Sequence, residues 1–281
     1  MRLLLTGAEG FTGTHLGVTA TLAGYQVFPL RTQLGDRTRL HEQIQQISPT
    51  HVVHLAAISH VTHDDLLAYY QTNLLGSLDL LEALTHLAIP PQKVILASSA
   101  NVYGNVLQSP IVETQLPAPV NHYAMSKVAM ELLARNFDSR LPIITTRPFN
   151  YTGRGQNSHF VIPKIIDHFL RKASMIELGN LDVHREYNDV RDICSIYLAL
   201  LERGQAGQTY NLASGRTHSL RQVITLLESV TGHSMAVQVN PQLVRSNEII
   251  TLSGSSVHLE KAIGKITWRS LESTLNWMMG T

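Results

Sequence analysis

The sequence predicts an α/β fold, a doubly wound parallel sheet with a smaller lobe attached to it. Short apolar runs alternate with longer stretches that carry apolar residues at helical spacing. The short runs are nearly continuous in apolar character, which is typical of parallel strands covered on both faces. Repeated β-α-β units with right-handed crossovers build an open sheet with helices on both sides.

The individual elements follow from these patterns and from the Gly, Pro, Ser and Asn residues between them. The predicted strands are Arg2–Thr6, Gln26–Leu30, His51–Ala56, Lys93–Ser98, Pro142–Arg147 and Thr209–Leu212. The predicted helices are Phe11–Ala23, Arg37–Gln46, Asp64–Leu87, Tyr123–Asp138, Phe160–Arg171, Asp189–Leu201, Leu220–Val230 and Leu271–Met278. In the third helix a single apolar stripe is predicted, made of Leu66, Leu67, Tyr70, Leu74, Leu78, Leu81 and Leu84.

The regular alternation ends after Arg147–Asn150. Loops rich in Gly and Asn follow, and the later segments are too fragmentary to fold alone. We therefore predict that residues 1–150 and 186–214 form the sheet domain. Residues 151–185 and 215–281 form the smaller lobe, built from inserted and C-terminal segments.

Composition excludes several classes of protein. The chain has 281 residues, and its 44% of apolar residues suffice for a sizeable core. With 22 Lys and Arg against 21 Asp and Glu, it lacks the charge of a dedicated nucleic-acid binder. No apolar run reaches the ~18–20 residues of a membrane span, and the single cysteine, Cys194, cannot form an internal disulfide. We expect a cytoplasmic globular protein without nucleic-acid or membrane partners.

A glycine-rich turn joins the first predicted strand to the first helix. Gly7 permits the tight turn, Gly10 lets the backbone approach a diphosphate, and Gly13 lets the helix pack on the sheet. The free N–H groups at the start of the helix attract phosphates. The spacing is Gly-x-x-Gly-x-x-Gly rather than the standard Gly-x-Gly-x-x-Gly, but its position predicts a Rossmann-type dinucleotide site.

The end of the second strand bears on the choice of dinucleotide. NAD-binding sites commonly have an acidic residue there, which binds the ribose 2′-hydroxyl. This strand ends in Leu30-Arg31-Thr32 and carries no acid. The Arg31 guanidinium suits the 2′-phosphate of NADP. NADP(H) is therefore favoured, and NAD(H) stays open because Arg31 can also be a solvated loop cation.

A second constellation predicts acid–base chemistry. Tyr123 and Lys127 lie four residues apart on one helical face, and we expect the ammonium to lower the pKa of the phenol. Ser99 lies at the carboxyl end of the fourth strand. Ligands of open α/β sheets bind beyond these ends, so the three side chains are predicted to converge beside the glycine turn.

Taken together, the motifs resemble those of the extended short-chain dehydrogenase/reductases, a family that includes nucleotide-sugar epimerases, dehydratases and reductases. The resemblance covers nearly the whole chain. Its motifs are Thr6–Gly13, Asp36, His54–Ala57, Asn73, Ser98–Gly104, Tyr123 with Lys127, Arg147–Asn150, Gly179–Asp182, Arg185, Asp189–Asp192 and Tyr210–Gly215.

The resemblance implies roles for particular residues, and it implies a homodimer. The implied catalytic residues are Ser99, Tyr123, Lys127 and Asn73. The implied cofactor-binding residues are Gly7, Gly10, Phe11, Gly13, Arg31, Asp36, Leu55, Ala56, Ala57, Tyr123, Lys127 and Arg147. The implied substrate-binding residues are Ser99, Asn150, Arg185, Arg245 and Glu248.

Within that family the chain is most similar to the GDP-mannose-type enzymes. Dehydratases of this group have an acidic residue just past the catalytic Ser or Thr, whereas this chain has Ala100-Asn101. Elimination of water would lack its general catalyst. The resemblance therefore implies reduction of the C4 ketone of a nucleotide-linked 4-keto-6-deoxyhexose, GDP-4-keto-6-deoxy-D-mannose, to GDP-D-rhamnose or its talose epimer.

Other functions stay open. The enzymatic alternatives are a nucleotide-sugar 4-epimerase or dehydratase and a dTDP-4-keto-6-deoxyhexose reductase. A more remote alternative is a non-catalytic NAD(P)-binding sensor. A metal site is not expected, because His60 and His63, beside Asp64 and Asp65, lack a third ligand at convincing spacing.

Overall fold

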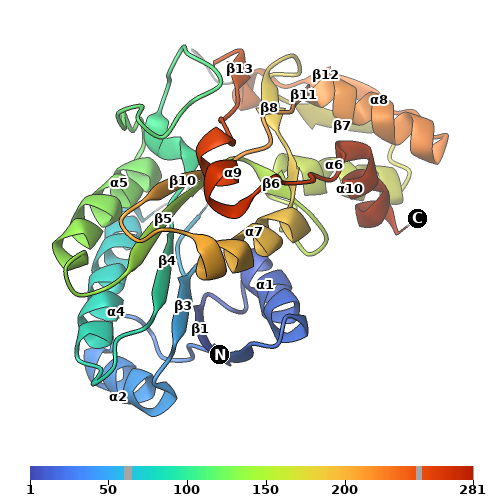
Figure 1. Cartoon of the computed structure of the whole chain (residues 1–281). Coiled ribbons are helices and arrows are strands. Elements are labelled where there is room, and N and C mark those ends of the chain that lie inside the picture. Colours follow the sequence, from blue (N-terminus) through green and yellow to red (C-terminus); the bar gives the residue numbers. More distant parts are fainter. Residues whose placement is uncertain (60–64, 245–248, 281) are drawn as a thin grey trace.

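The computed structural model of the chain describes residues 1–59, 65–244 and 249–280. A six-stranded sheet in the order β10-β5-β4-β3-β1-β2 forms its centre (Figure 1). All neighbouring strands in it are parallel. The strands are β1 (Arg2–Thr6), β2 (Gln26–Pro29), β3 (His51–His54), β4 (Lys93–Ala97), β5 (Ile143–Pro148) and β10 (Thr209–Leu212). The predicted doubly wound parallel sheet is confirmed, and each predicted strand is present.

Helices cover both faces of this sheet (Figure 1). Successive side chains of β1 alternate between the two layers, as a strand requires. Leu3 and Leu5 lie in the core with α1 (Phe11–Leu22), α7 (Val190–Arg203) and α9 (Val257–Ile263). Leu4 lies in the other core, with α2 (Arg37–Ile47), α4 (Gly76–Thr85) and α5 (His122–Ala134).

The strand order predicts a ligand crevice at the centre of the sheet. β1 pairs with β2 on one side and with β3 on the other, so the winding reverses between β1 and β3. Connections that leave such neighbouring strands in opposite directions open a crevice at their carboxyl ends. The glycine turn follows β1, and Leu55 and Ala56 follow β3, so these predicted cofactor-binding residues meet at this point.

The helix predicted for Asp64–Leu87 is helical from Leu66 to Thr85, but it is not one regular α-helix, and Asp64 lies outside the described residues. The segment divides into α3 (Leu66–Tyr69), a π-helical turn (Tyr70–Leu75) and α4. A π-turn adds a residue to the turn and changes the direction in which later side chains point. Leu66 and Leu67 are therefore 47% and 67% exposed, while Leu81 and Leu84 are fully buried, and the predicted single stripe does not exist.

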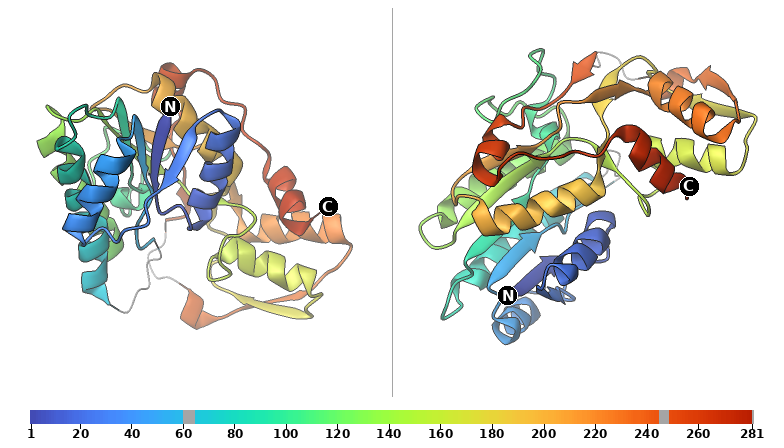
Figure 2. Two further views of the ribbon diagram at one scale, coloured as in Figure 1. Left: turned by 90° about the horizontal axis from the view of Figure 1, so that it is seen from below. Right: turned by 45° about the vertical axis from the view of Figure 1, so that its right-hand side comes forward.

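The smaller lobe lies beyond the carboxyl ends of the strands and has its own apolar core (Figure 2). Three helices supply most of that core: α6 (Val161–Leu170), α8 (Leu220–Thr231) and α10 (Leu271–Met279). The paired short strands are β7 (Met175–Leu178) with β12 (Ala236–Val239), β8 (His184–Glu186) with β11 (Thr217–Ser219) and β13 (Thr251–Leu252), and β6 (Tyr151–Thr152) with β9 (Asn188–Asp189). Strands of two to four residues carry too little pattern for sequence prediction.

Segment 257–263 departs from the expected division of the chain. It falls within 215–281, the range expected for the lobe, yet it forms α9, whose Leu259 and Ile263 share the sheet core with α7. In the described part of the chain, short 3₁₀ helices at Ala100–Tyr103, Arg135–Phe137 and Pro241–Leu243 complete the elements. Among the residues that the structure describes, no helix is long and apolar enough to cross a membrane.

A buried histidine ties the central strands to α4. The Nδ1 atom of His54 lies 2.7 Å from Thr6 Oγ1, and its Nε2 atom lies 2.8 Å from Ser77 Oγ. Burial, helped by the charge of Lys127, lowers the pKa of His54 to about 3 from a usual 6.5. Between these two pH values the unfolded chain binds the extra proton, so stability falls as the pH drops below 6.5.

We expect the free energy of unfolding to be about 2 kcal/mol lower at pH 5 than at pH 7 because of His54 alone. Urea unfolding at the two pH values measures this difference. The His54→Asn variant no longer titrates at this position. Its free energy of unfolding is therefore expected to change by about 2 kcal/mol less between pH 7 and pH 5 than that of the parent protein. An equal pH dependence in both proteins would contradict the assignment.

Candidate active site

The glycine turn is shaped to admit a dinucleotide close to the backbone. Gly7 has φ of +66°, and a Cβ atom there would lie 2.8 Å from the Ala56 nitrogen. A Cβ atom at Gly13 would lie 2.1 Å from the Gly7 carbonyl oxygen, so only glycine lets α1 start this close to the turn. Gly10 is the N-cap of α1 and supplies no capping side chain. The first N–H groups of α1 therefore suit a diphosphate.

Aromatic side chains support the start of α1. Phe11 stacks on Tyr151 with ring centroids 6.0 Å apart, and Thr12 Oγ1 lies 2.8 Å from the Tyr151 hydroxyl. Tyr151 begins β6, with two residues between it and the end of β5, and is packed against the sheet core. It thereby joins the predicted cofactor site to the loop that carries Asn150, a link that sequence spacing does not indicate.

Ser99, Tyr123 and Lys127 converge at the carboxyl end of β4. Ser99 begins the 3₁₀ helix that follows this strand, and Asn121 caps α5 by accepting from Ala124 N at 2.8 Å. Tyr123 hydrogen-bonds Ser99. Lys127, one helical turn further on, donates its Nζ to the carbonyl oxygen of Ala97 at 2.7 Å. The predicted constellation is thus assembled in space.

The pKa shifts of Tyr123 and Lys127 differ from the prediction. Burial raises the pKa of the Tyr123 phenol, and the hydrogen bond with Ser99 only partly opposes it. Burial also lowers the pKa of Lys127 to about 8. The expected lowering of the phenol pKa by the ammonium is therefore wrong for this structure. Tyr123 is a neutral phenol at pH 7, which is the protonation state of an acid that delivers a proton.

Asn73 lies in the π-helical turn and is fully buried. Its Oδ1 accepts from Ile58 N at 2.9 Å, and its Nδ2 donates to Ile58 O and to Ser126 Oγ at 3.2 and 3.0 Å. Ser126 in turn donates to the Tyr123 carbonyl at 2.8 Å. Asn73 therefore holds the loop after β3 against α5, one helical turn from the Tyr123 phenol.

The other predicted cofactor residues have diverse surroundings. Arg31 is exposed at the end of β2, and Asp36 caps α2 by accepting from Arg39 N at 3.2 Å. Arg147 is buried, with Nη2 2.6 Å from Glu131 Oε2 and Nη1 3.0 Å from the Tyr103 hydroxyl. The described contacts of Arg147 are thus to protein groups beneath the site.

The predicted substrate residues are only partly described. Asn150 lines a small cavity of about 20 Å³ together with Ala100, Asn101, Phe149, Glu186 and Leu252. Arg185 Nη1 donates to the carbonyl oxygens of His184 and Ile249, both at 2.8 Å. Arg245 and Glu248 lie outside the described residues, as do His60 and His63.

Glu186 is a residue of this site that sequence analysis missed. Its carboxylate is 1% exposed and accepts hydrogen bonds from Gly254 N at 2.8 Å, Ser214 N at 2.7 Å and Asn188 Nδ2 at 2.8 Å. Burial raises its pKa. It joins three loops that surround the cavity. The only feature of the sequence that could have indicated Glu186 as a site residue is its position between Arg185 and the Asp189–Asp192 motif.

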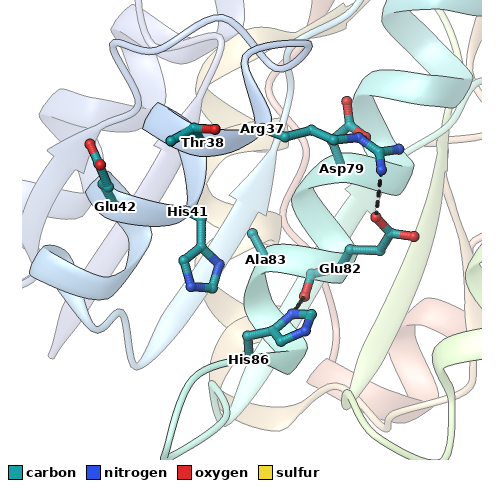
Figure 3. A pocket seen from close by; sticks show the side chains of 8 residues that line it. All are labelled: Arg37, Thr38, His41, Glu42, Asp79, Glu82, Ala83 and His86. Atoms are coloured by element: carbon teal, nitrogen blue, oxygen red, sulfur yellow. Dashed lines mark hydrogen bonds and ion pairs between the residues drawn. The ribbon is translucent and has the colours of Figure 1, made fainter.

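A larger hollow lies elsewhere, on the outer surface between α2 and α4, with a volume of about 460 Å³ (Figure 3). Among its charged side chains, Arg37 pairs with Asp79 and Glu82. It contains none of the predicted site residues. Over residues 1–59, 65–244 and 249–280, no three His, Cys, Asp or Glu side chains are grouped closely enough to hold a metal.

A dinucleotide-type glycine turn beside a buried Ser, Tyr and Lys defines the class of protein, an NAD(P)-dependent short-chain dehydrogenase/reductase of the extended type. Comparison with known proteins narrows this class. The chain belongs to the GDP-mannose 4,6 dehydratase family, whose pattern matches residues 29–273.

Individual relatives agree with this family. A GDP-6-deoxy-D-mannose reductase from Pseudomonas aeruginosa is 34% identical, covering 94% of this chain and 91% of that protein. A GDP-6-deoxy-D-talose 4-dehydrogenase from Aggregatibacter actinomycetemcomitans is 31% identical, covering 94% of this chain and 92% of that protein. The structure of RMD from Pseudomonas aeruginosa complexed with NADPH has a TM-score of 0.93 at 32% identity, covering 99% and 97% of the two chains.

Proposed function

We propose that this enzyme uses NADPH to reduce the C4 ketone of GDP-4-keto-6-deoxy-D-mannose, giving GDP-D-rhamnose or its talose epimer. The observation that carries the proposal is the arrangement at the end of β4. A neutral phenol and a serine hydroxyl lie together there, and the neighbouring residue Asn101 cannot ionise. Two of the relatives are named as a 4-dehydrogenase and a reductase of GDP-6-deoxyhexoses, which supports the same reaction.

In this mechanism the residues of the chain bind, orient and protonate. Bound NADPH supplies the hydride. Ser99 and Tyr123 donate hydrogen bonds to the ketone oxygen, and Tyr123 delivers its proton as the alkoxide forms. Lys127 lies one helical turn from Tyr123, where its ammonium would stabilise the phenolate left behind and would bind the nicotinamide ribose. Asn150 and Arg185, with Arg245 and Glu248, hold the nucleotide sugar.

The absence of an ionisable side chain at positions 100 and 101 supports reduction over dehydration. Expulsion of a C6 hydroxyl needs a further acid and base, and Ala100 and Asn101 supply neither. A 4-epimerase differs in another way, since it returns its hydride and consumes no NADPH overall. A dTDP-sugar reductase would differ only in how it recognises the base.

Oxidation of NADPH against a panel of GDP- and dTDP-linked 4-keto-6-deoxyhexoses tests the proposal. We expect stoichiometric NADPH consumption with the GDP-linked sugar and a much lower kcat/KM with its dTDP counterpart. Analysis of the product distinguishes the rhamno from the talo isomer. Interconversion of C4 epimers without net NADPH consumption would support the epimerase and contradict the proposal.

Arg31 is proposed to bind the 2′-phosphate of NADPH, which supports NADP(H) over NAD(H). Its side chain is exposed beyond β2 and makes no ion pair within the described part of the chain. We expect Arg31→Ala to weaken NADPH binding about tenfold or more, because it removes a charge-assisted hydrogen bond, and to leave NADH binding nearly unchanged. Fluorescence titration of both nucleotides measures this.

Arg39→Ala is the matched control, because it removes an exposed cation that pairs with Asp36 on the same helix start. Its effect on NADPH affinity should be at most about twofold. Equal losses in the two variants, or equal losses for NADPH and NADH in Arg31→Ala, would contradict the assigned role.

A homodimer in the cytoplasm is part of the proposal. Leu66, Leu67, Met125 and Leu132 expose apolar surface on α3 and α5, the helices that would pair across a two-fold axis. Sedimentation of the purified chain tests the dimer, and a monomer at micromolar concentration would contradict it.

A further inference from the structure

Asn101 contacts the catalytic serine through two donors. Its backbone N–H donates to Ser99 Oγ at 3.2 Å, and its Nδ2 donates to the same oxygen at 3.1 Å. Neither group belongs to the Ser, Tyr and Lys set from which the reaction was derived. Asn101 also lines the small cavity shared with Asn150 and Glu186, so it lies beside the place proposed for the substrate.

These two contacts fix the direction in which the serine proton points. A hydroxyl has one proton to donate and two lone pairs that accept. Both lone pairs of Ser99 Oγ are used by Asn101, so its proton is directed to another acceptor. Tyr123 is the partner that the structure shows. The phenol, having accepted from Ser99, directs its own proton away from it.

We propose that Asn101 is a positioning residue that makes Ser99 a hydrogen-bond donor and Tyr123 the proton donor to the ketone oxygen. This inference rests on the proposed function, reduction at C4. In the free enzyme the hydrogen bonds run from Asn101 to Ser99 and from Ser99 to Tyr123. When the substrate is bound, the ketone oxygen takes the place of Tyr123 as acceptor for Ser99 and also accepts from Tyr123. An ionised carboxylate at position 101 would accept the serine proton and reverse the first step.

The variant Asn101→Asp tests this direction with almost no change of shape. We expect kcat to fall about tenfold or more at pH 8, while the KM for the sugar and the Kd for NADPH stay within about twofold. The loss should shrink as the pH falls, because the introduced carboxyl donates again once it is protonated. Asn101→Ala keeps the backbone donor to Ser99. Its kcat should therefore fall less than that of Asn101→Asp, and the dependence of its kcat on pH should match that of the parent protein.

Asn105→Asp is the matched control for charge. Asn105 is exposed four residues further on, so the variant adds the same charge near the site without touching Ser99. Its kcat and pH profile should match the parent protein. If Asn101→Asp and Asn101→Ala lose the same activity at every pH, the role of Asn101 is steric and the proposal is overturned.

A second readout does not depend on turnover. The pKa of the Tyr123 phenol can be followed by NMR of ¹³Cζ-labelled tyrosine and assigned with Tyr123→Phe. Loss of the serine donor should raise that pKa in Asn101→Asp, and an unchanged value overturns the proposal. If Asn101→Asp does not fold, Asn101→Leu removes the amide donor but keeps the backbone donor, so it should raise the Tyr123 pKa by a smaller amount, and an unchanged value overturns the proposal. If the parent protein reduces no 4-keto sugar, the proposed function fails, and this titration still decides the role of Asn101.

Discussion

Tyr123→Phe is expected to lower the rate of NADPH oxidation by about 10³-fold while leaving NADPH affinity within about twofold. The change removes one hydroxyl from a side chain that is 6% exposed. The ring that fills the space stays, so the fold and the crevice above the sheet should be unchanged. What is lost is the neutral acid that protonates the ketone oxygen. Steady-state kinetics and fluorescence titration of NADPH measure the two quantities separately.

Tyr151→Phe is a suitable comparison, because it removes a buried hydroxyl close to the same site. The Tyr151 hydroxyl bonds Thr12 rather than Ser99, and burial raises the pKa of Tyr151 to about 12. We expect the rate of NADPH oxidation in this variant to fall by about tenfold or less. If Tyr123→Phe kept turnover comparable to that of Tyr151→Phe, the acid–base assignment would fail.

The parts of the site that sequence analysis predicted are those set by local rules. Gly7, Gly10 and Gly13 follow from what a turn and a helix start require between a strand and a helix. Tyr123 and Lys127 follow from helical spacing, and Ser99 follows from the end of a strand. Because parallel strands end at one edge of the sheet, these local predictions were enough to bring the three side chains together.

What sequence analysis missed depends on contacts between distant segments. The π-turn around Asn73 exists where α3, α5 and the loop after β3 pack together, and no periodicity in its own residues reports it. Glu186 is buried by loops that carry Ser214 and Gly254, far along the chain. The sign of the pKa shift of Tyr123 was also missed, since burial is a property of the folded neighbourhood and outweighs the hydrogen bond with Ser99.

The second large expected effect concerns Arg147, which was predicted to bind the cofactor. Arg147 and Glu131 form a bidentate pair whose side chains are 5% and 7% exposed, with Nε 3.0 Å from Oε1 and Nη2 2.6 Å from Oε2. Arg147→Met would leave the Glu131 carboxylate buried without its cation. We expect it to lower the free energy of unfolding by about 3–5 kcal/mol, measured by urea unfolding at pH 7.

The double variant Glu131→Met with Arg147→Met separates a structural role from a cofactor contact. Two apolar side chains of similar volume replace the pair and leave no buried charge, so most of the lost stability should return. The guanidinium is engaged by Glu131 and Tyr103 and is buried beneath the site, so we expect the double variant to bind NADPH within about threefold of the parent protein. A stable double variant that has lost tenfold or more in NADPH affinity would show instead that Arg147 contributes to the cofactor site, as the family resemblance implied.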